Sequence, residues 1–428
     1  MIFSIRQLQE KCVEQQRPLY MVFIDLTKAF DYVSRSGLFF VLQRLGCPPT
    51  LLAILQGFHD GMRATVQFNG SRSEEFGVAC GVKQGCVLAP TLFAIYFSAL
   101  LSRAFPDPSG VLLHSRFDGN FFNLARLKAR SRTKRFLVRE LLYADDAAFV
   151  ANSEQELQQM VDRFATACTE FGLTISLRKT MVMAQGVPSP PNITINGTPL
   201  TVVDKFSYLG STMTDSNNLE TELSNRIGRA ATTFGRLQSR VWSNTHLSEK
   251  LKVRVYEACI LSVLLYGSES WPTYRRQEDR LNAFHFRRLR SILGISWQDR
   301  VPNTDILERT GSTDMYTILR RKRLRWVGHV RRMDDARLPK AIFHGELVEG
   351  QRARGRPRLR YKDVLKRDLT AFNISAKEWT VMAEDRIKWK SAISRGTAIS
   401  SDAYTTLCNQ RRERSRVRLH RRMRRTRP

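Results

Sequence analysis

The segment ELLYADDAAFVA, residues 140–151, strongly constrains how the surrounding part of the chain can fold. Two adjacent acids, Asp145 and Asp146, stand between the apolar runs 141–143 and 147–151. Side chains alternate between the two faces of a strand, and tight turns accept polar residues, so the pattern predicts a β-hairpin with both acids at its tip. Two interpretations of these acids stay open: they are solvated turn residues, or they are half of a metal site.

The segments around this hairpin alternate between strands and helices. Residues 18–26 form an apolar run that ends in Asp25, as expected for a buried strand. The run 153–172 begins with a capping box, Ser153 and Glu156, and is predicted to be a helix. Further helices are expected within 37–58 and 87–105, and strands or hairpins at 64–79, 173–177, 180–184 and 192–203. This order favours an α+β fold, an antiparallel sheet with helices on one face.

Asp25, Asp145 and Asp146 can form one site if their strands are neighbours. Asp25 precedes the acidic hairpin by about 120 residues, but neighbouring strands would bring Asp25, Asp145 and Asp146 to one edge of the sheet. Like charges so close repel each other unless a divalent cation neutralises them. Oxygen-only clusters of this kind suit Mg²⁺, and pairs of such ions carry out in-line phosphoryl transfer in polymerases. An ordinary acidic turn is the alternative.

The charge balance indicates a polyanionic partner. Lys and Arg number 69 and Asp and Glu 40, which gives +29 over 428 residues. Nucleic acid is the commonest polyanion. An anionic membrane surface would also serve, but no apolar run approaches the ~18 residues of a spanning helix, and the N-terminus lacks the order of a secretory signal. Seven dispersed cysteines without a CxxC pair support neither a disulfide framework nor a zinc site, and they fit a reducing compartment.

Five motifs stand in the order and spacing of one enzyme family. They are FIDLTKAFD (23–31), GVKQGCVLAPTLF (81–93), LLYADDAAFVA (141–151), FGLTISLRKT (171–180) and FSYLGS (206–211). Together they resemble the reverse transcriptase of a non-long-terminal-repeat (LINE-type) retrotransposon, of the clade that also carries an apurinic-type endonuclease. The resemblance covers nearly the whole chain and is tightest over 19–212. It implies an RNA-directed DNA polymerase that extends a DNA 3′-hydroxyl on an RNA template by two-metal phosphoryl transfer.

The resemblance implies catalytic roles for four residues. Asp25 and Asp145 match the two metal-binding aspartates of the family, and Asp146 matches the third acid. The metal would be two Mg²⁺ (or Mn²⁺) ions. Lys179 matches the lysine that protonates or neutralises the leaving pyrophosphate, and the alternative for it is a solvated lysine at a strand end.

The same match implies substrate-binding positions. The backbone at Leu26 and Thr27 is expected to face the deoxynucleoside triphosphate. Phe30 is expected to block a ribose 2′-hydroxyl, and together with Ala144 it favours a DNA product over RNA. The remaining positions are Gln84 and Gly85 beside the template and nascent base pair, and Tyr208, Leu209 and Gly210 in the primer grip. A tyrosine in the core is the alternative for Tyr208.

The chain also departs from the family pattern. It begins about two dozen residues before Asp25, whereas the family carries an endonuclease and a fingers region ahead of the first motif. We therefore expect an N-terminally truncated polymerase, in which positioning of the triphosphate would suffer. Two alternatives follow: a catalytically inactive retroelement remnant that binds RNA or DNA through its basic C-terminal region, and a translated fragment without a selected role.

Three regions are expected along the chain. Residues 1–212 would form a partial reverse transcriptase palm, 213–300 a helical thumb-like or connector region, and 301–428 a basic, mainly helical nucleic-acid-binding region with a disordered Arg-rich tail. This last region holds 33 Lys and Arg against 14 Asp and Glu, which is +19 of the total of +29. The expected partners are an RNA template and a DNA primer or target, without a membrane. The expected location is nuclear, or otherwise a cytoplasmic ribonucleoprotein.

Within the basic region, residues 320–333 could lay a basic helix face along a phosphate backbone. Trp326 and Trp389 are candidates for base stacking, and a place in the core is the alternative for both. The segment from Arg354 to Pro357 is similar to the core of an AT-hook, which inserts arginines into a narrow A·T minor groove; the alternative is a solvated basic linker.

Overall fold

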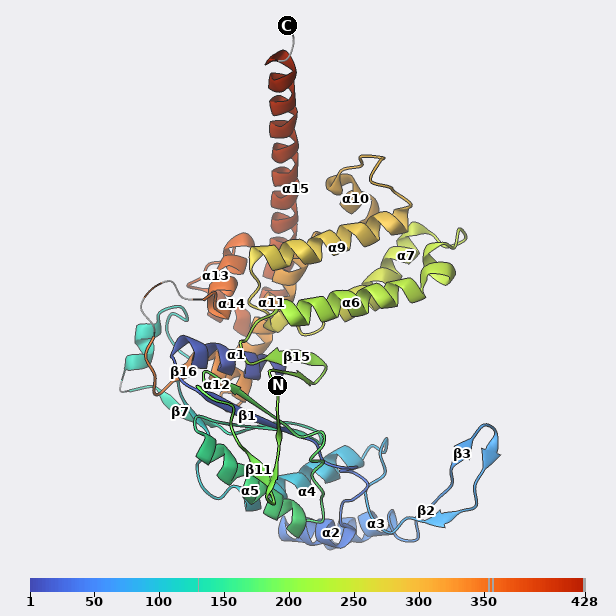
Figure 1. The fold of residues 1–428 in the computed structure, drawn as a ribbon, viewed down its shortest axis with the longest axis vertical. Coiled ribbons are helices and arrows are strands. Elements are labelled where there is room, and N and C mark those ends of the chain that lie inside the picture. The colour runs from blue at the N-terminus through green and yellow to red at the C-terminus, as the bar shows by residue number, and fades with distance from the viewer. Residues whose placement is uncertain (130, 353–354, 356–357, 426–428) are drawn as a thin grey trace.

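A five-stranded sheet forms the centre of the N-terminal half (Figure 1) in a computed structural model that describes the backbone of residues 1–129, 131–352, 355 and 358–425, with side chains up to residue 417. The strand order is β13 (Thr201–Val202), β10 (Met181–Gln185), β1 (Leu19–Ile24), β9 (Asp146–Ala151) and β8 (Glu140–Tyr143). β1 runs antiparallel to both of its neighbours, and β8 and β9 form the predicted hairpin, whereas the short β13 runs parallel to β10. The predicted α+β fold is confirmed.

The central strand β1 is apolar on both faces. Val22 and Ile24 belong to one hydrophobic core, and Met21 and Phe23 to another on the opposite side of the sheet. A strand that buries both faces needs cover on both sides of its sheet. The fold supplies this cover with two different sets of elements.

Helices cover the first face, as predicted. They are α2 (Arg35–Arg44), α4 (Ala89–Ala104) and α5 (Glu154–Glu170), and they lie below the sheet in Figure 1. Phe164 of α5 packs edge-to-face on Phe149 of β9, with ring centroids 4.8 Å apart. α5 begins where the capping box was predicted, since the Ser153 hydroxyl accepts a hydrogen bond from the Glu156 amide at 3.2 Å.

A projecting arm extends this side of the molecule (Figure 1). It consists of α3 (Pro49–Gly57) and a thin ribbon of paired strands, β2 (Arg63–Ala64) with β5 (Phe76–Gly77) and β3 (Gln67–Phe68) with β4 (Ser71–Arg72). The turn of the ribbon is the predicted Asn-Gly pair, in which Asn69 and Gly70 have φ of 47° and 82°.

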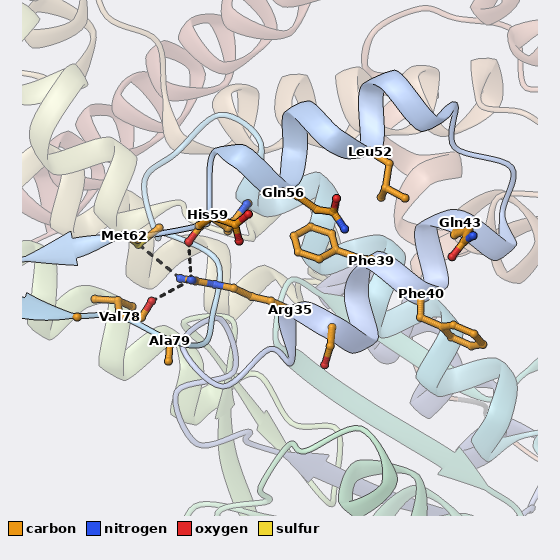
Figure 2. A pocket seen from close by; sticks show the side chains of 14 residues that line it. Arg35, Phe39, Phe40, Gln43, Leu52, Gln56, His59, Met62, Val78 and Ala79 are labelled. Carbon is orange, nitrogen blue, oxygen red and sulfur yellow. Dashed lines mark hydrogen bonds between the residues drawn. The ribbon is translucent and has the colours of Figure 1, made fainter.

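Arg35 of α2 fixes this arm to the rest of the N-terminal half. A cavity of about 950 Å³ lies between α2, α3 and β5, and Arg35 is at its base (Figure 2). The guanidinium donates hydrogen bonds to the carbonyls of His59 (2.7 Å), Val78 (2.9 Å) and Gly81 (3.0 Å). The charge of Arg35 is therefore committed to main-chain carbonyls, and the cavity does not offer it to an anionic ligand.

The second face of the sheet is covered by segments from both ends of the chain. These are α1 (Ile2–Glu14), α12 (Leu338–His344), the hairpin of β14 (Lys205–Tyr208) and β15 (Ser211–Thr214), and a three-stranded sheet of β16 (Gly345–Leu347), β6 (Val111–Ser115) and β7 (Lys134–Val138). Leu8 of α1 and Ile342 of α12 share a core with Met21 of β1. The prediction placed helices on one face of the sheet only, and the structure shows that the second face is covered as well.

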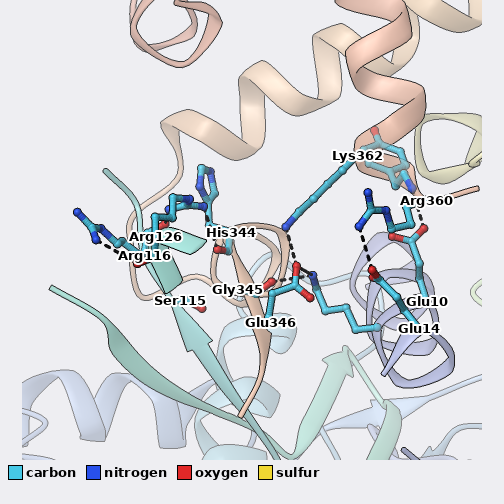
Figure 3. Close-up of polar contacts among 12 residues, drawn as sticks. Glu10, Glu14, Ser115, Arg116, Arg126, His344, Gly345, Glu346, Arg360 and Lys362 are labelled. Atoms are coloured by element: carbon cyan, nitrogen blue, oxygen red, sulfur yellow. Dashed lines mark hydrogen bonds and ion pairs between the residues drawn. The ribbon is translucent and has the colours of Figure 1, made fainter. Parts of the chain in front are cut away.

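A buried polar network fixes α1 to the C-terminal part of the chain (Figure 3). Glu346 of β16 pairs with Lys362 at 2.8 Å and with Lys11 of α1 at 3.4 Å. Burial alone would raise the pKa of Glu346, but the two ammonium groups lower it well below its usual range. Glu14 of α1 pairs with Arg360 at 2.9 Å in the same network. α1 thus lies between the central sheet and a polar group formed by Glu346, Arg360 and Lys362.

A helical region follows the sheet and projects to the right in Figure 1. It contains α6 (Glu220–Arg236), α7 (Glu249–Val255), α8 (Ser262–Leu264), α9 (Arg275–Leu293) and α10 (Asn303–Thr310), with π-helical turns at Gln238–Trp242 and Tyr256–Leu261. Its core includes Phe234, Tyr256 and Leu289. Met315 and Leu319 also belong to this core, so packing continues past the boundary that we place near residue 300.

The C-terminal helices are α11 (Met315–Arg332), α13 (Tyr361–Ala371), α14 (Trp379–Glu384) and α15 (Arg386–Arg425). Trp389 is buried and its indole N–H donates to the Leu324 carbonyl at 3.0 Å. A Cβ at Gly328 would stand 2.0 Å from that indole nitrogen, so glycine is what lets Trp389 pack on α11. Trp326 is partly buried edge-on against Phe3, at 5.5 Å. Trp389 belongs to the core, so the base-stacking prediction is wrong for it, whereas for the half-buried Trp326 it stays a prediction.

The Arg-rich tail differs from the prediction of disorder. α15 continues to Arg425 as one helix of 40 residues and leaves the body of the molecule (Figure 1). Arginine has a high helix propensity, and the helix is already started by the packed residues Trp389 and Ile393. The candidate AT-hook depends on Arg354, Arg356 and Pro357, which lie outside the described residues. None of the helices that the structure describes has the length and apolar character needed to cross a membrane.

Candidate active site

Asp25 and Asp146 lie side by side at the end of the central sheet where β1 finishes and β9 begins, which is called the sheet edge below. Asp25 follows the last residue of β1, and Asp146 is the first residue of β9. The register pairs Ile24 with Ala147, so the next position along the two strands places Asp25 beside Asp146. The strand register therefore places Asp25 and Asp146 next to each other.

Asp145 lies in the hairpin turn. Tyr143 pairs with Asp146, which leaves Ala144 and Asp145 as a two-residue turn. Ala144 has φ of +53°, a left-handed conformation that is uncommon for a residue other than glycine. This turn fixes where the Asp145 carboxylate leaves the backbone.

The pKa of Asp146 shows that the negative charges of the three acids interact. Burial raises the pKa of Asp146, and the negative charges of Asp145 and Asp25 raise it further. Burial also raises the pKa of Tyr208, with a smaller effect from Asp146 in the same direction. The edge of the sheet therefore carries concentrated negative charge that favours a cation.

Lys179 supplies one positive charge at this edge. Its ammonium lies 3.2 Å from the carboxylate of Asp25, and the two side chains are 61% and 33% exposed. The segment before Lys179 is fixed to Asp25 as well, because the Ser176 amide donates to the Asp25 carbonyl at 2.8 Å. The first and fourth motifs thus meet at Asp25, and Lys179 can reach whatever binds there.

The donor chemistry at this edge fits a hard divalent cation, since carboxylate oxygens are the ligands that Mg²⁺ and Mn²⁺ prefer. Among the residues that the structure describes, no group of three or more His, Cys, Asp or Glu side chains has the arrangement of a metal centre. Repulsion among the acids and the ion pair with Lys179 oppose closer approach of Asp25, Asp145 and Asp146. The predicted three-acid centre is therefore not preformed.

The backbone after Asp25 is less open than predicted. The Thr27 amide donates to the Thr174 carbonyl at 2.8 Å, and Leu26 is buried in a β-bridge with Ile175. The Thr27 N–H is therefore committed within the fold and cannot bind a triphosphate, which corrects the prediction for this group. A sequence motif names the residues, but it does not reveal which of their amides the fold already uses.

Phe30 is held rigidly beside this edge. Its ring stacks on Phe93 of α4, with centroids 4.4 Å apart and planes inclined by 22°. Its carbonyl accepts a hydrogen bond from the Val82 amide at 2.8 Å. A ring that is stacked on Phe93 and anchored through its own backbone can act as a steric wall.

The loop that carries Gln84 and Gly85 is docked through Gly81, a residue to which sequence reasoning gave no role. The Gly81 amide donates to the Val33 carbonyl at 2.9 Å. A Cβ at Gly81 would stand 2.5 Å from the Asp31 carbonyl oxygen, so the approach requires glycine. Gln84 and Gly85 are exposed. Gly81 opens the second motif, which is the signal that could have identified it.

Tyr208 is a core residue, the alternative that the sequence left open. It is 3% exposed, lies against Phe23 and donates its hydroxyl hydrogen bond to the Leu141 carbonyl at 3.1 Å. Its side chain is therefore closed to a primer. Leu209 and Gly210, with φ of 47° and 74°, form the turn beyond it and remain candidates for such a contact.

Two residues of the helical region hold this turn. The Tyr266 hydroxyl donates to the Leu209 carbonyl at 2.9 Å, and Arg226 of α6 donates to the Gly210 carbonyl. Arg226 is itself paired with the buried Glu222 at 2.8 Å. Sequence reasoning missed these residues, because nothing local connects α6 to the turn. The turn is thus mechanically joined to the helical region.

The comparisons with known proteins agree with this geometry. Residues 2–213 match the family described as "Reverse transcriptase (RNA-dependent DNA polymerase)". This part of the chain belongs to the reverse transcriptase family. Reverse transcriptases as a family use divalent metal ions, which is consistent with the all-oxygen donors at the sheet edge.

Relatives of this reverse transcriptase are retrotransposon proteins. A transposon-derived protein of Caenorhabditis elegans is 27% identical over 271 residues, which cover 61% of this chain and 96% of that protein. The RNA-directed DNA polymerase from the non-LTR mobile element jockey of Drosophila funebris is 24% identical over 65% of this chain, which corresponds to 29% of that polymerase. A telomerase structure from Candida tropicalis aligns with 76% of this chain and 48% of its own, at 13% identity and a TM-score of 0.34. The assignment does not rest on that structure.

Proposed function

We propose that this reverse transcriptase domain is an RNA-directed DNA polymerase that extends a DNA 3′-hydroxyl with deoxynucleoside triphosphates on an RNA template. The observation that carries the proposal is the position of Asp25 beside Asp146, next to the turn that holds Asp145. The chain spans less than a third of the jockey polymerase, so the activity is proposed for the domain and not transferred from the whole relative.

Asp25, Asp145 and Asp146 would hold two Mg²⁺ or Mn²⁺ ions. Such ions activate the attacking hydroxyl and stabilise the leaving pyrophosphate. Binding requires the acids to draw together and Lys179 to release Asp25. The ion pair at 3.2 Å is largely solvated, so its loss costs little. Lys179 is then free to hold a proton for the leaving group.

The chain's own residues position the substrates. The Phe30 ring, fixed by Phe93, presents a wall against which a ribose 2′-hydroxyl would collide. The loop at Gln84 and Gly85 is exposed and can approach a template base, while the turn at Leu209 and Gly210 can approach the primer backbone. Transfer then depends on orientation, which supplies much of the rate in phosphoryl transfer.

Primer extension on an RNA template tests this proposal. Asp145→Ala and Asp25→Ala should each abolish extension with Mg²⁺, because each removes a carboxylate that the two ions share. Asp402→Ala is the matched control, since Asp402 is an exposed acid of α15 outside the palm. Extension by Asp145→Ala at the rate of the unaltered protein would exclude this edge as the catalytic site.

A second candidate function is binding of RNA or DNA without catalysis. The net charge of +29 favours it, with +19 beyond residue 300, because this charge does not depend on the acids of the palm. Loss of extension in all variants, together with retained binding, would identify the second function.

A further inference from the structure

Trp297 is exposed in a way that the other tryptophans are not. It lies in the loop between α9 and α10 and is 83% exposed, whereas Trp271, Trp379 and Trp389 are buried. Tryptophan is highly buried on average and is enriched at binding hot spots, so an indole with this exposure is a candidate contact for a ligand. The loop holds it there: the Ser296 amide donates to the Asp299 carboxylate at 2.7 Å and closes the turn.

A cavity of about 530 Å³ lies beside this indole, between α9 and the loop. Its floor includes Phe286, and its rim includes Arg287 and Arg290 of α9. Arg287 is exposed, and within the described part of the chain it makes no hydrogen bond or ion pair. Arg290 donates one hydrogen bond to the Val301 carbonyl at 2.9 Å, which leaves other guanidinium donors for a ligand. The cavity therefore combines an aromatic face with cations that have spare donors.

The acids near this cavity do not cancel its charge. Asp279, which also lines it, pairs with Arg275 at 3.1 Å and accepts a hydrogen bond from the Tyr316 hydroxyl at 2.6 Å. The other side of the loop is different, since the cavity there is lined by Asp305 and Glu308. An anionic ligand would therefore approach Trp297 from the side of α9.

The basic helix α15 passes this side of the molecule. Tyr404 of α15 lies against Phe286, with ring centroids 6.4 Å apart, so α15 packs directly behind the cavity floor. The following turns carry Arg411, Arg412 and Arg414, all exposed. In Figure 1, α10 and the free part of α15 lie on the side of the helical region away from the central sheet. A chain of phosphates could follow α15 past Trp297.

We propose that Trp297, Arg287 and Arg290 form a second nucleic-acid site that binds a single strand. The indole stacks on one unpaired base, and the two guanidinium groups bind the flanking phosphates. Single strands fit this site better than duplexes, because a base must leave its stack to meet the indole. The proposal goes beyond the polymerase function and does not use Asp25 or Asp145.

The test is equilibrium binding of the full chain to two fluorescent probes at one fixed salt concentration: a 20-nucleotide oligo(dT) and a blunt DNA duplex of equal length. Trp297→Ala should weaken oligo(dT) binding by about 5- to 150-fold, the range measured for removal of a base-stacking side chain, with little change for the duplex. Trp297→Phe keeps an aromatic face and should stay within about threefold of the unaltered protein. Val381→Ala is the control, because Val381 is 70% exposed on α14 outside the cavity.

Circular dichroism and thermal unfolding confirm that each variant is folded before binding is compared. Unchanged oligo(dT) affinity in Trp297→Ala overturns the proposal and would point to a protein partner for Trp297. An equal loss of affinity for oligo(dT) and for the duplex also overturns the proposal. Asp145→Ala separates the two proposals, since it should lose extension and keep oligo(dT) affinity. Arg287→Gln should make the slope of log affinity against log salt for oligo(dT) less steep, by the amount expected for the loss of about one phosphate contact.

Discussion

The ammonium of Lys179 lies 3.2 Å from the carboxylate of Asp25, although the two residues are 154 positions apart in the sequence. The pair joins the first and fourth motifs of the palm. It also places a monovalent positive charge where a divalent cation is proposed to bind. Lys179 and the metal therefore compete for one carboxylate before they cooperate at the leaving group.

Lys179→Gln should separate these two effects. Loss of the competing ammonium should tighten Mn²⁺ binding, but by no more than about fivefold, because an exposed ion pair is worth about 0.2–1 kcal/mol. Extension at saturating metal should fall by about 10² or more, since a proton donor is lost. Mn²⁺ titration by electron paramagnetic resonance and single-turnover extension measure the two quantities. Arg178→Gln, at the exposed neighbouring position, should change neither.

Phe30→Ala should admit ribonucleotides. Removal of the ring that stacks on Phe93 opens space for a 2′-hydroxyl, and discrimination against ribonucleotides should fall on the order of tenfold. Competition between dATP and ATP in single-nucleotide extension measures the ratio. Phe40→Ala is the control, because Phe40 is exposed on α2. Unchanged discrimination in Phe30→Ala would remove Phe30 from the triphosphate site.

Deletion of residues 411–428 should weaken binding to RNA and DNA and flatten its salt dependence. Ten arginines are lost at once, and each phosphate contact that disappears lowers the slope of log affinity against log salt by about 0.7–0.9. Filter binding across a salt series gives the slope, which should fall by several units. Full affinity after the deletion would mean that the tail serves another partner.

Stability should fall as Glu10 ionises. Burial raises the pKa of Glu10 to about 7, against its ordinary 4.5, although a hydrogen bond from the Tyr361 amide and the charges of Lys11 and Lys362 partly offset this. The folded state holds the proton more tightly than the unfolded state, so the stability contribution is full below about pH 4.5 and is lost as pH rises through about 7.

Urea unfolding of Glu10→Gln checks this sign. The variant should gain about 1–3 kcal/mol relative to the unaltered protein between pH 4.5 and pH 8, because glutamine has no charge to bury. Glu378→Gln, at an exposed position, should show no such pH-dependent gain. A relative loss at pH 8 would contradict the raised pKa of Glu10.

Gly328→Ala and Gly235→Ala should have opposite effects. Both glycines lie inside helices, but a Cβ at Gly328 would collide with the Trp389 indole, whereas a Cβ at Gly235 meets nothing within 4 Å. Gly235→Ala should stabilise the protein by about 0.5–1 kcal/mol through helix propensity. Gly328→Ala should destabilise it by about 1–3 kcal/mol through overpacking. Thermal unfolding distinguishes the two, and equal shifts would show that the contact with Trp389 relaxes.

Local pattern was enough to predict the sheet edge and its acids. The apolar run before Asp25 and the two runs around Asp145 and Asp146 specify strands, and the motif order specifies that they are neighbours. Pattern could not reveal which groups the fold already uses. The Thr27 amide and the Tyr208 side chain look available in a motif, and both are committed to partners at remote positions.

The remaining differences have the same cause. The docking of α12 and β16 beside α1 depends on tertiary contacts across more than 300 residues, such as that of Lys11 with Glu346 of β16, and no local periodicity encodes such a pairing. The exposed indole of Trp297 was likewise invisible, since a tryptophan after a predicted helix is ordinarily expected in a core. The segment ILGISWQDR, in which Gly294 ends α9, was the available signal.

The cover of β1 by α12 and β16 has a consequence for how the protein is made. A ribosome releases the strands of the palm long before it has synthesised residues 338–347, so the core around Met21, Phe23 and Val150 lacks Ile342 and Leu347 until then. A protein that ends at residue 213, where the family match stops, would keep α1, β6 and β7 on that face but would lack Ile342 and Leu347, and the incomplete core would favour aggregation. Closing this core therefore requires the later segment with α12 and β16, and Lys362 fixes β16 there through Glu346.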